Sequence, residues 1–278
     1  MKKSILMVAL LLIGTFAMAQ PAIVIPQPSP LSKVEQRVGI TDISLSYSRP
    51  GLKGRKIFGD LVAFNEIWRF GANSPTAIKF SDSVKVGGTT LAAGEYAVYA
   101  IPGQTEWTIL FGKNPKVAAG DFKQEEAAAK IVVKAEALPM NVETFTFVFA
   151  NLTTSSADLT MMWEKTQVRI PISVDFDKKV MANINKVLND VNPYWAAANY
   201  YYDNNKDLNQ ALIWADKYIE KNSYYWTLHL KAKILRKLNK NKEAIAVAEK
   251  SLALAKADGD RAYVMNNEKL IAEAKAAK

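Results

Sequence analysis

The spacing of hydrophobic residues changes once along the chain, at Asp177, and this change limits the possible fold more than any other feature. Before it, hydrophobic residues alternate with polar ones, as at Trp107, Ile109 and Phe111. That is the period of a strand with one buried face. After it, Val180 and Ile184 have the spacing of one face of a helix. The sequence therefore predicts a β-rich part followed by an α-helical part.

Residues 31–176 are expected to form an antiparallel β-sandwich. Short strand-like runs follow one another with turn residues about every ten positions and without a strand–helix–strand rhythm, which is typical of sandwiches. An eight-stranded jelly roll fits the same pattern. Gly87-Gly88 is predicted to be a hairpin turn. The Glu- and Ala-rich run from Gly120 to Lys130 favours a short surface helix.

Residues 177–278 are expected to form consecutive helices. The first begins near Asp177, and the second begins with Asn192 as its N-cap and Pro193 as its first residue. From this second helix onward, the expected helices cover residues 194–203, 207–221, 224–238, 242–256 and 260–276. Asn- and Gly-containing breaks separate them, because these residues accept the backbone conformations that end helices.

Two of the predicted helices repeat. Ala211 and Ala215 correspond to Ala244 and Ala248 at an offset of 33 residues, close to the tetratricopeptide period of about 34. Small residues at such positions let paired helices approach closely. The helical part is therefore interpreted as tetratricopeptide-like, although the full Trp-Leu-Gly-Tyr pattern is missing. So few repeats are expected to pack on a neighbour or a partner.

The first 30 residues are expected to direct export. Two lysines follow Met1, an apolar run extends from Ile5 to Phe16, and Ala17-Met18-Ala19 has the pattern of a cleavage site. Residues 1–19 are therefore interpreted as a secretory signal peptide, and the proline-rich residues 20–30 as an extended tether. The apolar run is short for a membrane span, so no stable membrane insertion is expected after cleavage. The predicted location is periplasmic or secreted.

Charge is distributed unevenly. Residues 20–177 carry 16 basic and 16 acidic side chains, whereas residues 178–278 carry 18 and 11. The basic character of the chain thus belongs to the helical part. The chain contains no cysteine, which excludes disulfides, a lipid-anchored cysteine and a thiol nucleophile.

One segment of the β-rich part concentrates positive charge. Residues 47–73 contain five Arg or Lys and only two Asp or Glu. Arg49-Pro50-Gly51-Leu52 is predicted to be a type II turn with Gly51 at positive φ. Guanidinium groups bind carboxylates and sulfates through a planar fork, and a tryptophan face can stack on a sugar. The candidate residues for an anionic or carbohydrate ligand are Arg49, Lys53, Arg55, Trp68, Arg69 and Asn73. The alternative is that the arginines bridge carboxylates and loop carbonyls, with Trp68 in the core.

The same segment carries several strings that together resemble one family. They are Tyr47-Ser48-Arg49-Pro50, Lys53-Gly54-Arg55-Lys56-Ile57-Phe58-Gly59 and Trp68-Arg69-x-Gly71-Ala72-Asn73, followed by Gly87-Gly88, Ala93-Gly94-x-Tyr96, Ile101-Pro102-Gly103 and Glu106-Trp107-Thr108. From about Ser29 to Asp175, the chain resembles the domain of unknown function 2911 family, exported proteins of Bacteroidota-type bacteria. The resemblance implies a β-rich exported domain and brings no catalytic residues.

Aromatic residues are concentrated in the helical part. Ten of the 17 Trp and Tyr residues lie between Tyr194 and Trp226. Tyr200, Tyr201 and Tyr202 are consecutive, and successive helical side chains point about 100° apart, so all three cannot face one core. These three tyrosines and Trp226 are the candidate residues for binding a protein or peptide partner. Nucleic acid is not expected, because the lysines are scattered and the chain is predicted to be exported.

No set of catalytic residues or metal ligands can be drawn. The single histidine, His229, lies within a predicted helix and is interpreted as a packing residue. One His and no Cys do not make a zinc or haem site, so no metal and no cofactor are expected. The sequence favours a non-catalytic binding or scaffold protein. The alternative is a small-ligand or carbohydrate module centred on the arginine-rich segment, and an enzyme remains the less favoured interpretation.

Overall fold

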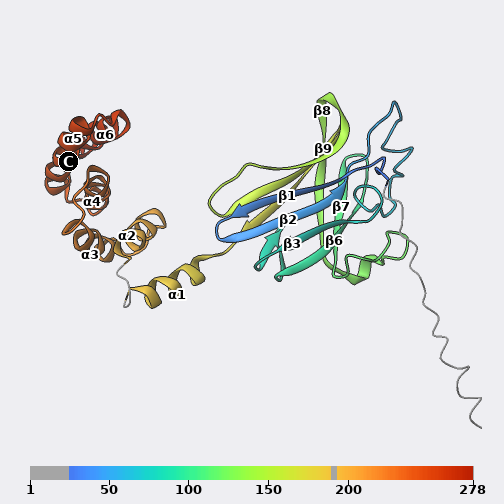
Figure 1. The fold of residues 1–278 in the computed structure, drawn as a ribbon, viewed down its shortest axis with the longest axis horizontal. Coiled ribbons are helices and arrows are strands. Elements are labelled where there is room, and N and C mark those ends of the chain that lie inside the picture. Colours follow the sequence, from blue (N-terminus) through green and yellow to red (C-terminus); the bar gives the residue numbers. More distant parts are fainter. Residues whose placement is uncertain (1–24, 189–192, 278) are drawn as a thin grey trace, which may run out of the picture. The chain divides into compact units, whose positions relative to one another are not determined.

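A computed structural model of the protein describes residues 25–188 and 193–277. The chain divides into two compact units, Met1–Asp175 and Phe176–Lys278, here called the β unit and the helical unit (Figure 1). The predicted signal peptide, residues 20–24 of the predicted tether and the predicted Asn192 cap lie outside the described residues.

Within residues 25–175, nine strands form one antiparallel sheet in the order β1-β2-β3-β6-β7-β8-β9-β4-β5. The strands are β1 (Leu31–Val38), β2 (Thr41–Ser48), β3 (Thr76–Phe80), β4 (Val84–Val86), β5 (Thr89–Leu91), β6 (Gly94–Ile101), β7 (Glu106–Gly112), β8 (Ala127–Ala150) and β9 (Ser156–Val174). The predicted β-rich part is thus confirmed as an antiparallel sheet.

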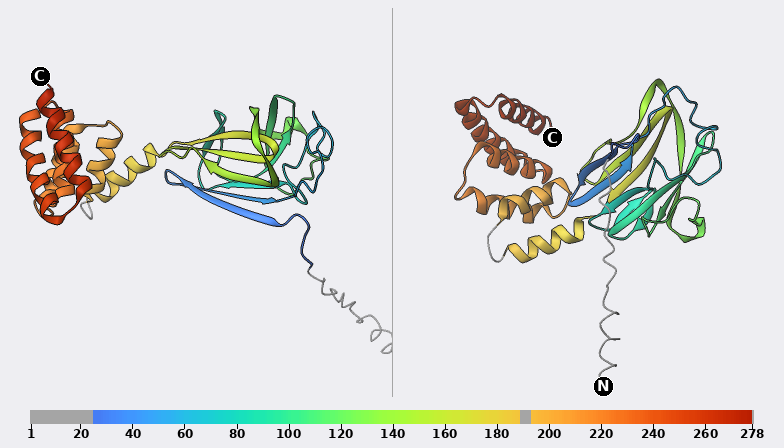
Figure 2. Two further views of the ribbon diagram at one scale, coloured as in Figure 1. Left: turned by 90° about the horizontal axis from the view of Figure 1, so that it is seen from above. Right: turned by 45° about the vertical axis from the view of Figure 1, so that its right-hand side comes forward.

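The long strand β8 gives the sheet its shape. Its first part, to Lys134, pairs with β7, and from Ala135 onward it pairs with β9. Irregular register between Ala137 and Thr146 places extra β8 residues opposite β9, and such bulges bend a strand and increase its twist. The sheet curls so that β1 comes near β9 (Figure 2).

Aromatic rings fill the core of the β unit. Phe145 is fully buried, and its ring contacts the rings of five residues: Tyr47, Trp68, Phe70, Phe147 and Trp163. All five pairs are edge-to-face, the geometry that the charge distribution of aromatic rings favours. The alternating Phe145 and Phe147 on β8 place both rings on the same inward face.

The predicted hairpin turn at Gly87-Gly88 is confirmed. Both residues have positive φ, 54° and 86°, as the two-residue type I′ turn requires, and they join β4 to β5. A Cβ at Gly87 would lie 2.8 Å from the Ile131 side chain, so packing also requires glycine there.

Two local predictions were wrong. Only Gln124–Glu126 form a short 3-10 helix, and Ala127 already begins β8. Pairing with β7, where Phe111 faces Ala129, outweighs the helix propensity of alanine. Gly51 is also not at positive φ. It forms an antiparallel bridge with Thr144, so the segment after Arg49 lies extended along β8 instead of turning.

The helical unit contains six helices within residues 176–188 and 193–277. They are α1 (Asp177–Val187), α2 (Tyr194–Asp203), α3 (Leu208–Ile219), α4 (Tyr225–Lys237), α5 (Asn241–Asp258) and α6 (Arg261–Ala276). Three of the predicted breaks are confirmed at Asn205, Asn239 and Gly259, which have positive φ and so stop the helical path. Asp207 and Asp260 cap α3 and α6 by accepting backbone N–H groups.

Candidate functional site

The arginine-rich segment is held along β8. Arg49 donates from Nε to the Phe145 carbonyl (3.0 Å) and from Nη2 to Thr146 Oγ1 (2.7 Å). The Leu52 N–H donates to the Glu143 carbonyl, and the Lys53 N–H donates to Glu143 Oε1. The bonds from Leu52 and Lys53 satisfy backbone N–H groups of a segment whose irregular backbone has few partners of its own. The bonds from Arg49 hold its side chain against β8.

The other predicted ligand-binding residues have separate protein partners. Arg55 donates to the carbonyls of Leu52 and Gly51 (3.0 and 2.7 Å). These two bonds close the loop between Gly51 and Arg55. Arg69 Nη1 donates to the Asn73 carbonyl (3.0 Å), and Asn73 Nδ2 donates to the Ser29 carbonyl and Ser48 Oγ. The structure therefore brings Arg69 and Asn73 together. The guanidinium groups of Arg49, Arg55 and Arg69, however, each donate to different acceptors and do not share one.

Trp68 packs against the aromatic core and is partly exposed. Its Nε1 donates to the Gly71 carbonyl (3.0 Å), and its ring stacks on Trp163 with a centroid separation of 6.0 Å and an interplanar angle of 18°. It also meets the rings of Phe58, Phe70, Trp107 and Phe145. The Trp68 ring, which the sequence suggested as a stacking face for a sugar, thus packs against other aromatic rings of the β unit.

The three consecutive tyrosines of α2 point to different surroundings, as the helix period requires. The Tyr200 hydroxyl donates to the Asp177 carboxylate, which also pairs with Lys206 (2.7 Å). Tyr201 packs edge-on against Trp214. The Tyr202 ring lies 4.3 Å from Lys233 Nζ and 4.1 Å from Lys237 Nζ, measured to its centroid.

Trp226, the fourth predicted partner-binding residue, lies at the start of α4. It stacks on the exposed Tyr224 ring at 4.5 Å and meets Tyr225 edge-on. The Tyr225 hydroxyl donates to Asp260 (3.0 Å). Burial and the neighbouring Asp260 raise the pKa of Tyr225 to about 12, so this phenol remains a donor at neutral pH.

A buried polar network in the helical unit was not predicted. Asn267 Nδ2 donates to Ser251 Oγ and to the Tyr263 carbonyl, both at 2.8 Å, and Ser251 Oγ donates to the Tyr225 carbonyl. The Tyr263 carbonyl can only accept a hydrogen bond, so the side-chain amide of Asn267 must point its Nδ2 at that carbonyl. The other atom of the amide, Oδ1, then lies 2.8 Å from His229 Nδ1. His229 therefore carries its proton on Nδ1. The only sign of this network in the sequence was Asn267, a polar residue at a position where the helical spacing predicts a buried face.

His229 makes the stability of the helical unit depend on pH. Burial lowers the pKa of His229 below its ordinary 6.5, and the nearby Lys233 acts in the same direction. The unfolded chain then binds the proton more tightly than the folded chain. The free energy of unfolding should therefore fall as the pH drops from about 6.5 towards the lowered pKa, and His229 should add no pH dependence above that range.

The measurement is the urea midpoint of the helical unit between pH 5 and 7. His229→Gln should flatten the decline relative to the unchanged protein. The Asp177 and Asp260 carboxyls have lowered pKa values and contribute only at more acidic pH. An unchanged slope in His229→Gln would contradict the assignment.

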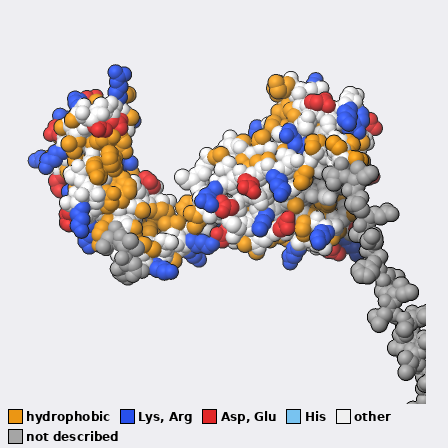
Figure 3. Space-filling view, viewed as in Figure 1, with side chains coloured by type: hydrophobic (Ala, Val, Ile, Leu, Met, Phe, Trp, Pro, Cys, Tyr) orange, Lys and Arg blue, Asp and Glu red, His pale blue; other side chains and the backbone are white. Residues whose placement is uncertain are grey.

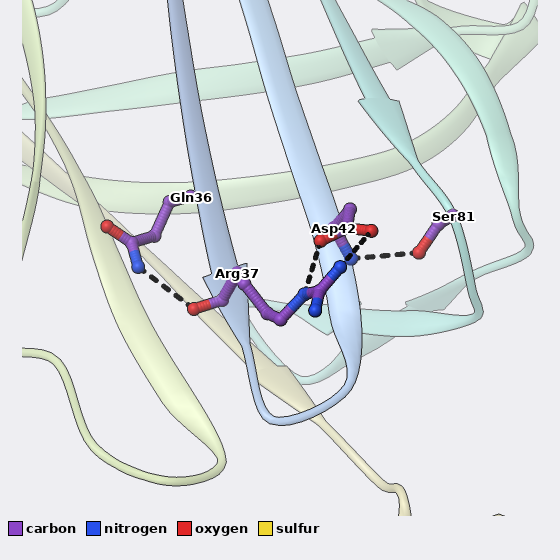
Figure 4. Close-up of polar contacts among 4 residues, drawn as sticks. All are labelled: Gln36, Arg37, Asp42 and Ser81. Carbon is purple, nitrogen blue, oxygen red and sulfur yellow. Dashed lines mark hydrogen bonds and ion pairs between the residues drawn. The ribbon is translucent and has the colours of Figure 1, made fainter.

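Two cavities in the β unit are lined by residues other than the predicted ligand-binding residues. The larger, of about 650 Å³, lies at the β1–β2 turn and is lined in part by Glu35, Lys79 and Ser81. There Arg37 pairs with Asp42 at 2.6 Å, and Ser81 Oγ accepts from the Asp42 N–H (Figure 4). Both charged side chains are mostly exposed, so this cavity is an open surface groove. The second cavity holds about 200 Å³ and is lined in part by Phe58, Phe64 and Trp107.

A family model described as a protein of unknown function (DUF2911) matches residues 29–172, more than half of the chain. The chain belongs to the DUF2911 family. No curated protein and no solved structure matches it. The DUF2911 match lies wholly within the β unit.

Several strings by which the sequence resembles DUF2911 meet around one aromatic cluster. Phe58, Trp68 and Trp107 come from three separate strings, and their rings touch. Among the described residues, no group of three or more acidic or histidine side chains is placed to hold a metal ion. None of the helices in the described parts of this DUF2911 protein is long and apolar enough to cross a membrane.

Proposed function

We propose that this protein is an exported, non-catalytic binding protein whose helical unit binds an acidic segment of a protein or peptide partner. One observation carries the proposal: two lysine ammonium groups, of Lys233 and Lys237, lie on one tyrosine ring, that of Tyr202. The two cations repel each other, and a carboxylate bound between them relieves that repulsion.

The contacts of these lysines support the proposal. Lys237 Nζ donates to the Tyr202 carbonyl and Asn205 Oδ1, which are neutral acceptors. Among the described residues, neither lysine forms an ion pair with a carboxylate. Arg236, next to Lys237, is already paired with Glu273 (2.9 Å). A partner's carboxylate would thus meet two cations that form no ion pair within the described residues.

An apolar surface of the helical unit also fits a protein partner. On the face drawn in Figure 3, hydrophobic side chains form a stripe along the helical unit, with Lys and Arg side chains near its margins. Protein-binding surfaces commonly combine a hydrophobic centre with aromatic anchors and a polar rim. A carboxylate-bearing peptide with hydrophobic residues is the partner that matches both features.

Finer aspects of the fold belong to the same proposal. Ala211, Ala215, Ala244 and Ala248 are all fully buried, which supports a tetratricopeptide-like array with close helix pairing at a 33-residue interval. The curling of the nine-stranded sheet supports the β-sandwich interpretation. The N-terminal sequence pattern supports a periplasmic or secreted location.

The test is fluorescence anisotropy with a labelled peptide that alternates Glu and Leu, beside the same peptide with Gln in place of Glu. Changing both Lys233→Gln and Lys237→Gln should weaken binding of the acidic peptide by about tenfold, as expected for two charged contacts of about 0.7 kcal/mol each. The Gln peptide should bind more weakly and respond little to the double variant.

The matched control changes Lys242→Gln and Lys250→Gln on the exposed face of α5, which removes the same net charge. This control should bind the acidic peptide as the unchanged protein does. If both double variants weakened binding of the acidic peptide equally, the overall charge of the unit, and not the lysine pair, would explain the effect. Equal binding of the Glu and Gln peptides would refute the acidic partner.

A further inference from the structure

Strand β1 forms one edge of the nine-stranded sheet, and no strand of the described chain pairs with its outer side. All eight residues of β1 pair with β2 in a continuous register without a bulge. The strand at the other edge, β5, has only three residues. The unpaired N–H and C=O groups of an edge strand are a template for a further strand. β1 is therefore the longer of the two places where this sheet can be extended.

One hydrogen bond shows which backbone groups of β1 point outward, away from β2. The Arg49 N–H donates to the Pro30 carbonyl at 2.9 Å, one position before the Leu31 end of the pairing. Hydrogen-bonded and non-hydrogen-bonded pairs alternate along an antiparallel ladder, so the odd-numbered residues from Leu31 to Arg37 direct their N–H and C=O groups outward. The Arg37 carbonyl accepts from the Gln36 side chain at 2.9 Å (Figure 4). The other outward groups have no hydrogen-bond partner within residues 25–188 and 193–277.

The outer side of β1 is also open to solvent. Val34 points to the core side of the sheet and is partly exposed, whereas Leu45, opposite it on β2, is 1% exposed. The core-side pairs before and after it differ in the same way. β1 comes near β9, but it extends beyond the fully covered part of the core. A strand placed beside β1 would thus meet exposed backbone and a half-covered Val34.

The solvent face of β1 carries charges of alternating sign, on Lys33, Glu35 and Arg37. Arg37 faces Asp42 on β2 and pairs with it at 2.6 Å. Lys33 and Glu35 face serines of β2, and in the described part of the chain neither has an ion-pair partner. Charges on an edge strand usually prevent another strand from pairing with it. A strand with the opposite order of charges, however, would be attracted.

We propose that β1 binds the β1 strand of a second copy of this chain, antiparallel and around a two-fold axis at Val34. Lys33 of each copy then faces Glu35 of the other, and Leu31 faces Arg37. All four residues direct their backbone groups outward, so each pair can exchange two N–H···O bonds. Val34 faces its own copy across the axis, which covers both half-exposed side chains. A two-fold interface uses the same surface on both subunits, as this register does.

The charges select this register among its neighbours. Outward-directed residues must face one another, so the two strands can slip only in steps of two residues. One step in either direction would place Lys33 opposite itself or Glu35 opposite itself, and like charges directly opposite are destabilising. β1 provides eight residues, whereas a standard interface uses about 20–30 on each side. The dimer is therefore weak and forms at high protein concentration. It is independent of the function proposed for the helical unit.

The test is sedimentation equilibrium of residues 20–278, which contain the described parts of both units, from low micromolar to near-millimolar concentration. The average mass of the unchanged protein should rise with concentration towards that of a dimer. Lys33→Glu and Glu35→Lys should each weaken association about tenfold, because two attractive pairs become repulsive. An equimolar mixture of the two variants should associate as the unchanged protein does, since every Glu then faces a Lys. Misfolding of a variant could not produce that recovery. Lys85→Glu, on the exposed face of β4, makes the same charge change as Lys33→Glu and should leave association unchanged.

The register is tested by disulfide formation, because the chain contains no cysteine. Two copies of Val34→Cys would meet at the axis in a non-hydrogen-bonded pair, whose Cα atoms lie about 4.5 Å apart, within the range of a disulfide. Gln36→Cys is the matched control on the same face. Its two copies would lie four strand positions apart, about 14 Å. On oxidation, Val34→Cys should give a covalent dimer in non-reducing electrophoresis, and Gln36→Cys should not.

Four results would each overturn the proposal. The first is a mass that stays at that of the monomer over the whole concentration range, which would leave the open edge to a strand of another protein. The second is a mixture of the two charge variants that associates no better than either variant alone. The third is equal weakening by Lys85→Glu and Lys33→Glu. The fourth is equal cross-linking of Val34→Cys and Gln36→Cys.

Discussion

Phe145→Ala is expected to lower the free energy of unfolding of the β unit by about 3–5 kcal/mol, the usual cost of removing a fully buried phenylalanine. Phe145 is 0% exposed, and five aromatic rings surround it at centroid distances of 5.2–6.1 Å. These rings cannot collapse into the empty space, because each is held by its own strand or loop contacts. The cost should therefore lie in the upper part of the range.

Urea denaturation followed through the indole signals of Trp68, Trp107 and Trp163 reports on the β unit alone. Val132→Ala is the matched control, since Val132 lies on the same strand and is 60% exposed. It should cost about 1 kcal/mol or less, mostly through strand propensity. Similar losses in the two variants would show that the aromatic cluster is loosely packed.

The sequence predicts the order of the two units because hydrophobic periodicity depends only on which face of an element is buried. Ile78 and Phe80 on β3 are buried in alternation with exposed Lys79, and the pattern is visible without any tertiary information. Helix breaks were predictable for a similar local reason. Asn205, Asn239 and Gly259 are the residue types that tolerate positive φ.

Features that depend on distant partners could not be predicted from local patterns. Ala127 and Ala129 belong to a strand because β7 lies beside them, although alanine favours helices. Gly51 is extended because Thr144, more than ninety residues later, pairs with it. The same limit applies to the arginines, since the chain gives no sign that Arg49 reaches the Phe145 carbonyl.

The candidate sites show this limit most clearly. The sequence left two interpretations of Trp68 open, a stacking face for a sugar or a core residue, and the structure places its ring among other aromatic rings. The alternating pattern predicted that Trp107 lies on a strand but gave no sign that its N–H lacks a partner. An unpaired donor is a property of the surroundings of a side chain, and only the structure reveals those surroundings.

Asn267→Ala is expected to lower the free energy of unfolding of the helical unit by about 2–4 kcal/mol. Asn267 is 0% exposed and joins three helices through Ser251 and His229. Its loss leaves a buried hydroxyl and a partly buried imidazole N–H short of one partner each, and unsatisfied buried groups cost about 1–3 kcal/mol apiece. Alanine has a higher helix propensity than asparagine by about 0.7 kcal/mol or less, which offsets only part of this loss.

The neighbouring Asn266 provides the matched control, because it is exposed on the same turn of α6. Asn266→Ala should leave stability unchanged or raise it slightly, since only the propensity term remains. The indole signals of Trp195, Trp214 and Trp226 follow unfolding of the helical unit. A double-mutant cycle with His229→Ala then measures the coupling, which should be about 0.5–3 kcal/mol for residues in one hydrogen-bonded network. Strictly additive losses would mean that His229 and Asn267 contribute independently, and the polar network would then not hold α4 and α6 together.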